Sequence, residues 1–155
     1  MTNTEVLAAF MGVAVGFVPG FLAGEFKDWW WRSRRRKAHW CTLNAEIELC
    51  REMAQVFLAD RVMAPLYRLP TLSYLHSFPA LLADGALSNL EAGAVTRFYS
   101  EVETLNRGLD QAHAVRNEVS LLAEEFERNQ IKANKLVPSS SLYTNVRSMV
   151  VSRIG

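Results

Sequence analysis

The chain of 155 residues has little of several features that mark common functional classes. It has two cysteines, Cys41 and Cys50, which excludes the disulfide framework of a small secreted domain. Its 17 lysines and arginines nearly balance its 16 aspartates and glutamates, so no overall basicity indicates a nucleic-acid partner. It lacks the HExxH, CxxC, Glu-x-x-His and phosphate-loop spacings of metal and nucleotide sites. We therefore predict a non-enzymatic protein with no catalytic residue, no cofactor, no metal site and no nucleic-acid partner.

Charge is also missing from Val6 to Gly24, a run of 19 residues that are mostly apolar. A helix of that length rises roughly 28 Å, close to the ~30 Å hydrocarbon core of a bilayer. The preceding residues 2–5 contain no basic side chain, which disfavours a cleavable signal peptide. We expect a single transmembrane helix over residues 6–26, which Pro19 can kink, after an N-terminal segment of residues 1–5 outside the cytoplasm.

A basic, tryptophan-rich segment, residues 27–37, follows the predicted span; we call it the collar. Its one acid is Asp28, and the positive-inside rule keeps such a segment in the cytoplasm, with the N-terminus outside. The tryptophans belong at headgroup level, and the cations favour anionic lipid, although the collar can equally be a topology signal with no further role. The predicted headgroup-binding residues are Lys27, Trp29, Trp30, Trp31, Arg32, Arg34, Arg35, Arg36 and Lys37.

Inside the predicted span, four glycines recur every four residues and form one slowly winding stripe, the glycine face: Gly12, Gly16, Gly20 and Gly24. A stripe without side chains lets another helix backbone approach closely, as in GxxxG packing. We expect this glycine zipper to pack against a second copy of the chain or another membrane protein. The alternative is that glycine is simply common in membrane helices.

Residues 38–136 predict a cytoplasmic helical hairpin. A three-four apolar alternation, the first seam, continues from the collar: Trp40, Leu43, Ile47, Cys50, Ala54 and Phe57. Glu46 and Glu48 fall outside it, and this helix, which can be continuous with the span, should end near Ala64 because Pro65 follows. A compact connector with a short helix, about Leu72 to Ala83, comes next.

A capping box, Ser88 to Glu91, opens a second long helix of ~40 residues. Its apolar series, the second seam, falters at Arg116; the seam comprises Val95, Phe98, Val102, Leu105, Leu109 and Ala112. We expect the two seams to pair as an antiparallel, coiled-coil-like hairpin in which paired residue numbers sum to about 152. That register places an acidic run, Glu118, Glu124, Glu125 and Glu127, beside the collar.

The same register places Asn106 opposite residues 44–46, either as a buried register-fixing amide or as an exposed one. Residues 137–155 read as a linker and a short amphipathic tail helix. The whole chain is thus predicted to be all-α: one transmembrane helix, then a helical hairpin with a short helical connector.

The cytoplasmic part also carries four short segments that resemble those of a loose group of bacterial membrane proteins: residues 45–47, 64–70, 81–87 and 98–108. Members have one N-terminal span and a helical cytoplasmic domain. The resemblance covers roughly residues 5–130 and implies a bacterial inner-membrane setting, with no activity attached.

These observations favour a single-pass inner-membrane protein whose helical domain serves as an interaction or assembly module. The alternative is a small membrane-active effector, of phage or toxin type, which oligomerises through its glycine-rich span. Both hypotheses place the protein in a membrane with anionic lipid, and both allow a homo-oligomer.

Overall fold

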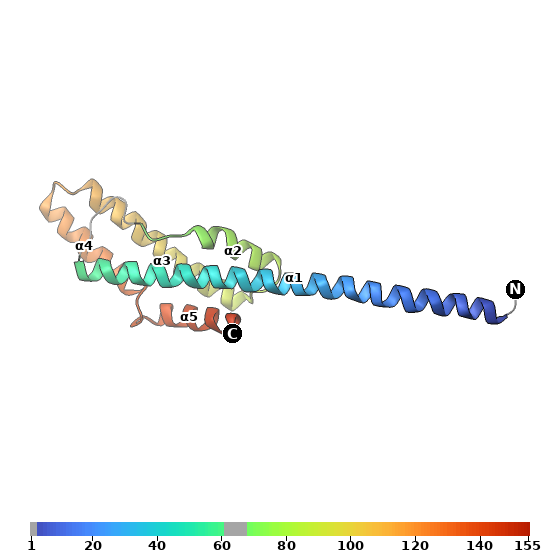
Figure 1. Ribbon diagram of the computed structural model, residues 1–155. Helices are drawn as coiled ribbons and strands as arrows, with labels where there is room; N and C mark the ends of the chain where they lie inside the picture. The colour runs from blue at the N-terminus through green and yellow to red at the C-terminus, as the bar shows by residue number, and fades with distance from the viewer. Residues whose placement is uncertain (1–2, 61–67) are drawn as a thin grey trace. The chain divides into compact units, whose positions relative to one another are not determined.

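The computed structural model describes residues 3–60 and 68–155, with side chains from residue 24 onward. This part of the chain is all-helical, as predicted, with five helices and no strand (Figure 1). The helices are α1 (Asn3–Asp60), α2 (Leu72–Ala83), α3 (Asn89–Ala114), α4 (Val119–Asn134) and α5 (Ser141–Ile154). The chain divides into two compact units, Met1–Arg36 and Lys37–Gly155.

The first unit is the N-terminal part of α1. It is helical from Asn3 onward, and the helix continues without a break through Pro19. The predicted span lies mostly on residues 1–23, whose side chains fall outside the described part, as do Gly12, Gly16 and Gly20. Among the helices of residues 24–60 and 68–155, none is both long and apolar enough to cross a membrane.

The second unit is a helical bundle built on the C-terminal part of α1. All six residues of the first seam are buried, at most 3% exposed, which confirms the three-four pattern. The flanking apolar residues Leu49 and Val56 are exposed, so the buried stripe is no wider than the seam on that side. The predicted end of this helix near Ala64 falls on residues 61–67, outside the described part.

The short helix α2 has the predicted bounds, Leu72–Ala83, and Pro79 lies inside it. It runs antiparallel to α1, since the Tyr74 amide donates to Glu46 at 3.0 Å while Pro70 accepts a hydrogen bond from Cys50. Twelve residues of helix span roughly 18 Å, so α2 carries the chain back along α1 rather than closing a tight turn.

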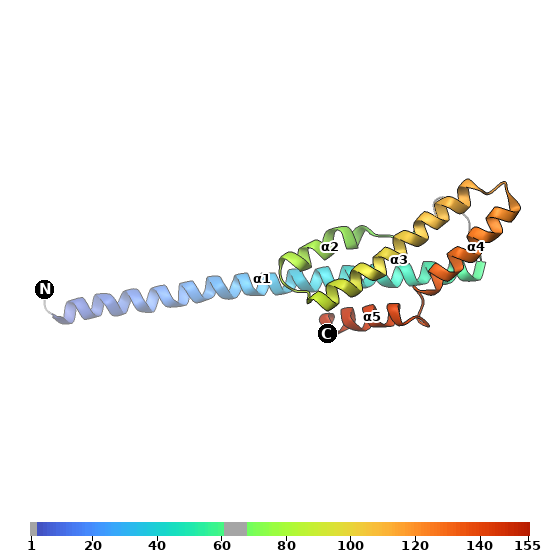
Figure 2. The ribbon, with the colours of Figure 1, turned by 180° about the vertical axis from the view of Figure 1, so that it is seen from behind.

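Because α2 returns the chain, α3 runs in the same direction as α1, and the predicted antiparallel hairpin of the two seams is wrong. The Tyr74 and Tyr99 rings stack with centroids 4.2 Å apart, and the Leu69 amide donates to Asn106 at 2.8 Å. Glu46, Tyr74 and Tyr99 therefore lie at one level of the bundle, so residue numbers of α1 and α3 rise together. The views in Figures 1 and 2 show the same course.

The second seam is buried as predicted, but the expected ~40-residue helix is wrong, because it breaks after Ala114. The break lies where the apolar register falters: the Val115 amide still bonds to Gln111, and α4 then starts afresh at Val119. Folding back lets α4 bury Asn129 and Ala133 against α3. The approach is close at Gly108, where an added Cβ would lie 1.8 Å from the Asn129 Oδ1 atom.

The acidic run, which the hairpin register placed beside the collar, has two members paired within α4. Glu124 and Glu125 both pair with Arg128 of their own helix, at 3.4 and 2.7 Å. The register fails because numbers along α1 and α3 increase in the same direction, so no constant sum describes their pairing.

The predicted linker and tail helix are present, but α5 is an integral part of the bundle. Ser140 caps it, accepting a hydrogen bond from the Leu142 amide at 3.2 Å. Tyr143, Val146 and Val150 are buried in the same core as the two seams. The C-terminal segment therefore completes the domain.

Candidate functional site

The collar is a continuous stretch of α1 whose aromatic side chains, and most of whose basic side chains, are exposed to solvent. The three tryptophans and Phe26 are 41–66% exposed. The Phe26 and Trp29 rings lie 5.8 Å apart, and the Trp30 and Trp31 rings meet edge to face at 5.6 Å. Large aromatic side chains exposed in such a group are typical of a surface that contacts another apolar phase.

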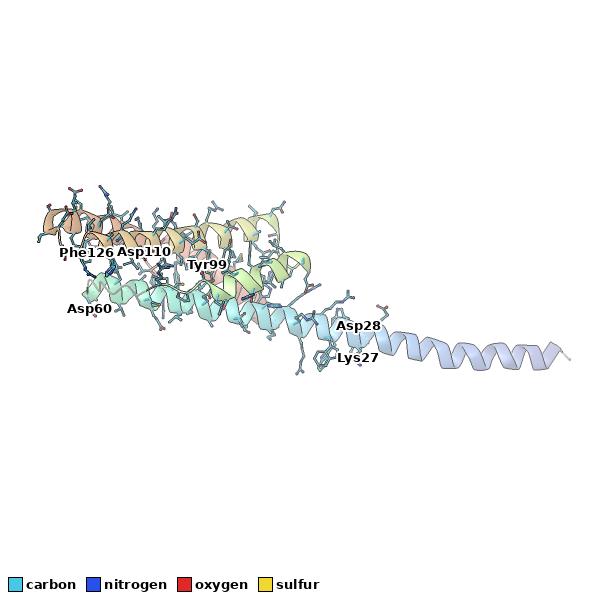
Figure 3. The ribbon with its side chains drawn as sticks, turned by 90° about the horizontal axis from the view of Figure 1, so that it is seen from above. Lys27, Asp28, Asp60, Tyr99, Asp110 and Phe126 are labelled. Atoms are coloured by element: carbon cyan, nitrogen blue, oxygen red, sulfur yellow. The ribbon has the colours of Figure 1, made fainter. Side chains whose placement is uncertain are left out.

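Basic side chains are interleaved with these rings. The Arg34 guanidinium lies 4.3 Å from the centroid of the Trp30 ring, a cation–π contact. Lys27 and Asp28 project from α1 at the start of the collar (Figure 3). Because a helix turns 100° per residue, eleven consecutive residues surround the axis completely, so the collar presents cations and rings in every direction.

Of the glycine face, only Gly24 lies among residues whose side-chain surroundings are described. A Cβ added there would meet no atom within 4 Å, so the backbone at this point is open to a partner. Gly12, Gly16 and Gly20 lie outside the described residues, and their packing stays a prediction.

In the bundle, Glu46 is a buried carboxylate, 6% exposed, that the sequence placed outside the seam. It accepts hydrogen bonds from the amides of Ser73 and Tyr74 at 2.6 and 3.0 Å. These are the first-turn amides of α2, whose own N-cap residue, Thr71, makes no side-chain cap. The α1 carboxylate thus caps α2 and favours its N-terminal dipole.

Two further buried groups surround this carboxylate. Burial, reinforced by the negative charge of Glu46, raises the pKa of Tyr99 far above its usual range, so its hydroxyl stays neutral. Burial and the same charge raise the pKa of the Cys50 thiol. Cys50 is therefore an inert core residue, as the sequence indicated, and Cys41 is an exposed free thiol.

Asn106 neither faces residues 44–46 nor remains free, so both of its predicted settings are wrong. Its side chain accepts from the Leu69 amide at 2.8 Å and donates to the Leu69 carbonyl at 3.0 Å. One exposed ion pair, Arg68 with Asp110 at 2.7 Å, lies one helical turn away. Asn106 thus holds the segment that leads into α2, a role that helical periodicity alone cannot reveal.

His39, Ser77 and Thr42 form a closed chain of hydrogen bonds between α1 and α2. Thr42 donates to the His39 carbonyl at 2.9 Å, so Ser77 donates to Thr42, also at 2.9 Å. The Ser77 oxygen then accepts from His39 Nδ1 at 3.2 Å. These hydrogen bonds join α1 to α2 beside the buried Ser77.

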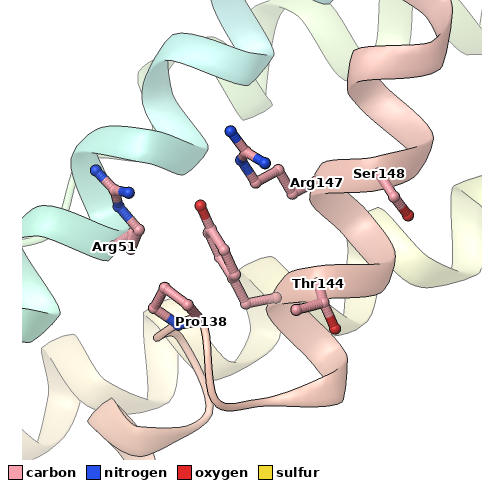
Figure 4. A pocket seen from close by; sticks show the side chains of 6 residues that line it. Arg51, Pro138, Thr144, Arg147 and Ser148 are labelled. Carbon is pink, nitrogen blue, oxygen red and sulfur yellow. The ribbon is translucent and has the colours of Figure 1, made fainter.

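A shallow groove of about 450 Å³ lies between α1 and α5, lined by Arg51, Pro138, Tyr143, Thr144, Arg147 and Ser148 (Figure 4). Glu48 of α1 accepts hydrogen bonds from two of these lining residues, Tyr143 and Arg147. Burial opposes ionisation of Glu48, but the hydrogen bonds from Arg147 and Tyr143 and the charge of Arg51 lower its pKa. The cations of this groove are thus already paired with a carboxylate, and the cluster fastens α5 to α1.

Within residues 24–60 and 68–155, no three histidine, cysteine or acidic side chains gather as metal ligands. Among the described residues, the feature that suggests a function is therefore the exposed collar. No protein-family model, no curated protein and no solved structure matches the chain.

Proposed function

We propose that the protein is a single-pass membrane protein, with its N-terminus outside and its helical domain in the cytoplasm, that acts as a non-enzymatic interaction or assembly module. The observation that carries this proposal is the collar, in which three consecutive exposed tryptophans are followed by a cluster of arginines, close after an uncharged helical stretch. Water disfavours such exposed rings, whereas the interfacial region of a bilayer accommodates them together with cations. The resemblance to bacterial membrane proteins supports an inner-membrane location.

The glycine face supplies the proposed means of assembly. Gly12, Gly16, Gly20 and Gly24 recur at four-residue spacing, and a single span has no other span of its own chain to pack against. We assign the partner as a second copy of this chain, with another membrane protein as the alternative.

The bundle supplies specificity rather than catalysis in this proposal. Its polar clusters cap helices, join helices or pair charges, as Glu46, Asn106 and Glu48 do. A rigid domain carried by an assembled span presents several copies of one surface to a cytoplasmic partner.

Cys41 provides a native probe of topology, because it is exposed while Cys50 is buried. In the Cys50→Ala chain, a membrane-impermeant maleimide should label Cys41 in inverted inner-membrane vesicles and not in intact spheroplasts. A control chain with Asn3→Cys and Cys41→Ser should show the reverse pattern. Labelling of Cys41 in intact spheroplasts would reject the proposed orientation.

Assembly is tested by oxidative crosslinking of single-cysteine chains scanned over residues 11–24, with Cys41→Ser and Cys50→Ala. Crosslinks that peak at positions 12, 16, 20 and 24 support the homo-oligomer. Uniformly weak crosslinks reject self-association through the glycine face. Loss of membrane potential on induction of the full chain would instead favour the membrane-active effector.

A further inference from the structure

The end of the bundle at which the second unit begins exposes apolar side chains next to charged ones, and we call it the proximal end: Lys37, Leu82, Leu90, Val151 and Arg153. The last helical turns of α2 and α5 and the first turn of α3 lie together there, where α1 enters the bundle (Figures 1 and 2). Arg153 contacts Glu91 at 2.6 Å, which brings the end of α5 to the beginning of α3.

The position of these residues follows from helix geometry. Glu46, Tyr74 and Tyr99 share one level of the bundle. Nine residues earlier along α1 and along α3 are Lys37 and Leu90, each roughly 13 Å nearer the N-terminal side. Eight residues later along the antiparallel α2 is Leu82. The apolar side chains therefore gather at the level at which the collar ends.

These apolar side chains are exposed without a covering element. Leu90 is 82% exposed, and Leu82 and Val151 are each 45% exposed. Leu90 lies in the first turn of α3, between the two capping-box partners Ser88 and Glu91, where a polar residue would serve the helix equally well. The capping function therefore does not explain the leucine.

The charged groups of the proximal end are the exposed Lys37, the ion pair of Arg153 with Glu91 and the half-buried Asp84. Lys37 is exposed, whereas Glu91 is only 14% exposed and is held by Ser88 and Arg153. Hydrogen bonds from Ser88 and Arg153 lower the pKa of Glu91 despite the opposing effect of burial, so its charge is compensated inside the bundle. The opposite end of the bundle exposes Asp60, Arg116 and Glu118.

We infer that the proximal end of the bundle rests on the anionic surface of the membrane, with Leu82, Leu90 and Val151 inserted among the headgroups. The inference rests on the proposed function and extends it, because the domain then has its own contact with the lipid in addition to the contact made by the collar. Exposed leucine and valine next to cations match an interfacial lipid surface. The collar, which ends at Lys37, is covalently continuous with this end.

The chain offers a matched pair of positions for the test. Leu90 and Val119 are equally exposed, each at 82% and each in the first turn of its helix, but Leu90 lies at the start of α3, whereas Val119 begins α4, after the other end of α3. Single-cysteine full-length chains, with Cys41→Ser and Cys50→Ala, would carry an environment-sensitive fluorophore at position 90, 119 or 16. The chains would be reconstituted in phosphatidylcholine–phosphatidylglycerol vesicles containing nitroxide-labelled lipid.

We expect headgroup nitroxide to quench the label at position 90 at least twofold more than the label at position 119. Acyl-chain nitroxide should quench the label at position 16. Equal, weak quenching at 90 and 119 with strong quenching at 16 overturns only the resting contact. Absence of quenching at 16 overturns the transmembrane proposal itself.

A second variant separates lipid contact from protein contact. In a Leu82→Gln, Leu90→Gln chain labelled at Val151→Cys, headgroup quenching should fall at least twofold while the helical content stays unchanged. If the label at position 90 is protected from quenching by aqueous iodide and is also not quenched by headgroup nitroxide, a protein covers the proximal end. That result would reject the proposed lipid contact.

Discussion

The collar and the first seam are consecutive parts of one helix, yet they use their apolar side chains in opposite ways. In residues 27–37 the tryptophans stay exposed and the cations spread around the axis. From Trp40 to Phe57, apolar residues at three-four spacing lie on one stripe, and other helices bury it. Helical backbone conformation therefore does not determine whether a side chain is buried. The spacing of the apolar residues decides whether neighbouring helices can cover their side chains.

The largest expected effect is on the seam. Phe57 is 1% exposed and stacks on Phe126 with centroids 6.3 Å apart. Phe57→Ala should lower the free energy of unfolding by about 3–5 kcal/mol, through lost burial and the cavity left behind. Denaturant unfolding followed by circular dichroism in detergent would measure the loss. Trp30→Ala, in the collar, should leave the unfolding midpoint unchanged. An equal loss of unfolding free energy in this variant would contradict the difference between the collar and the first seam.

The collar should in turn control orientation without affecting stability. Replacing Arg32, Arg34, Arg35 and Arg36 by glutamine removes about 4 kcal/mol of attraction to anionic headgroups, at about 1 kcal/mol per basic residue. The expected result is a mixed or inverted topology, measured by maleimide labelling of Cys41 from either side. Replacing four exposed bundle residues, Arg97, Arg107, Arg116 and Arg128, by glutamine is the control and should leave the orientation intact.

A smaller effect is expected where a polar residue joins α1 to α2. Glu46→Ala leaves the Ser73 and Tyr74 amides without their acceptor, which costs about 1–3 kcal/mol of unfolding free energy. Hydrogen exchange of the α2 amides should rise before that of α3. Glu52→Ala, at an exposed carboxylate of the same helix, should have no measurable effect, and similar losses for both variants would contradict the capping role.

The smallest effect concerns pH. The folded-state pKa values of Glu48 and Glu91 are lowered, so their contribution is present above the pKa of the unfolded chain and is lost as pH falls through the folded value. Acidification below about pH 4 should therefore loosen α5 first, seen as faster amide exchange in residues 141–154. An Arg147→Gln, Arg153→Gln chain should show weaker pH dependence, and an unchanged profile would refute this account.

Much of the bundle was predictable from the sequence, wherever the spacing of residues along the chain alone determines which side chains are buried or where a helix begins and ends. Both seams, the bounds of α2 and the Ser88–Glu91 capping box could be read from residue spacing, because each depends on neighbours within a few turns. The direction of α3 could not, because periodicity marks which face is apolar and says nothing of the direction in which the helix runs.

The polar joints were equally beyond a local pattern. Glu46 falls outside the seam, and its burial arises because α2 packs on the adjacent face of α1. Asn106 binds a backbone segment 37 residues away, and no spacing in the sequence connects the two. The break after Ala114 left only a faltering register at Arg116, which does not distinguish a bend from a new helix.

The amino-acid sequence was sufficient to predict that the described residues are helical, which faces of α1 and α3 are buried, and that charge and tryptophan concentrate in the collar. These are local properties, fixed by spacing and capping. Packing in three dimensions, in contrast, sets the common direction of α1 and α3, the return of α4 onto Gly108 and the closure of the core by α5. Those outcomes depend on which surfaces pack together, because the hydrophobic effect stabilises contacts between apolar faces that can lie far apart in the chain.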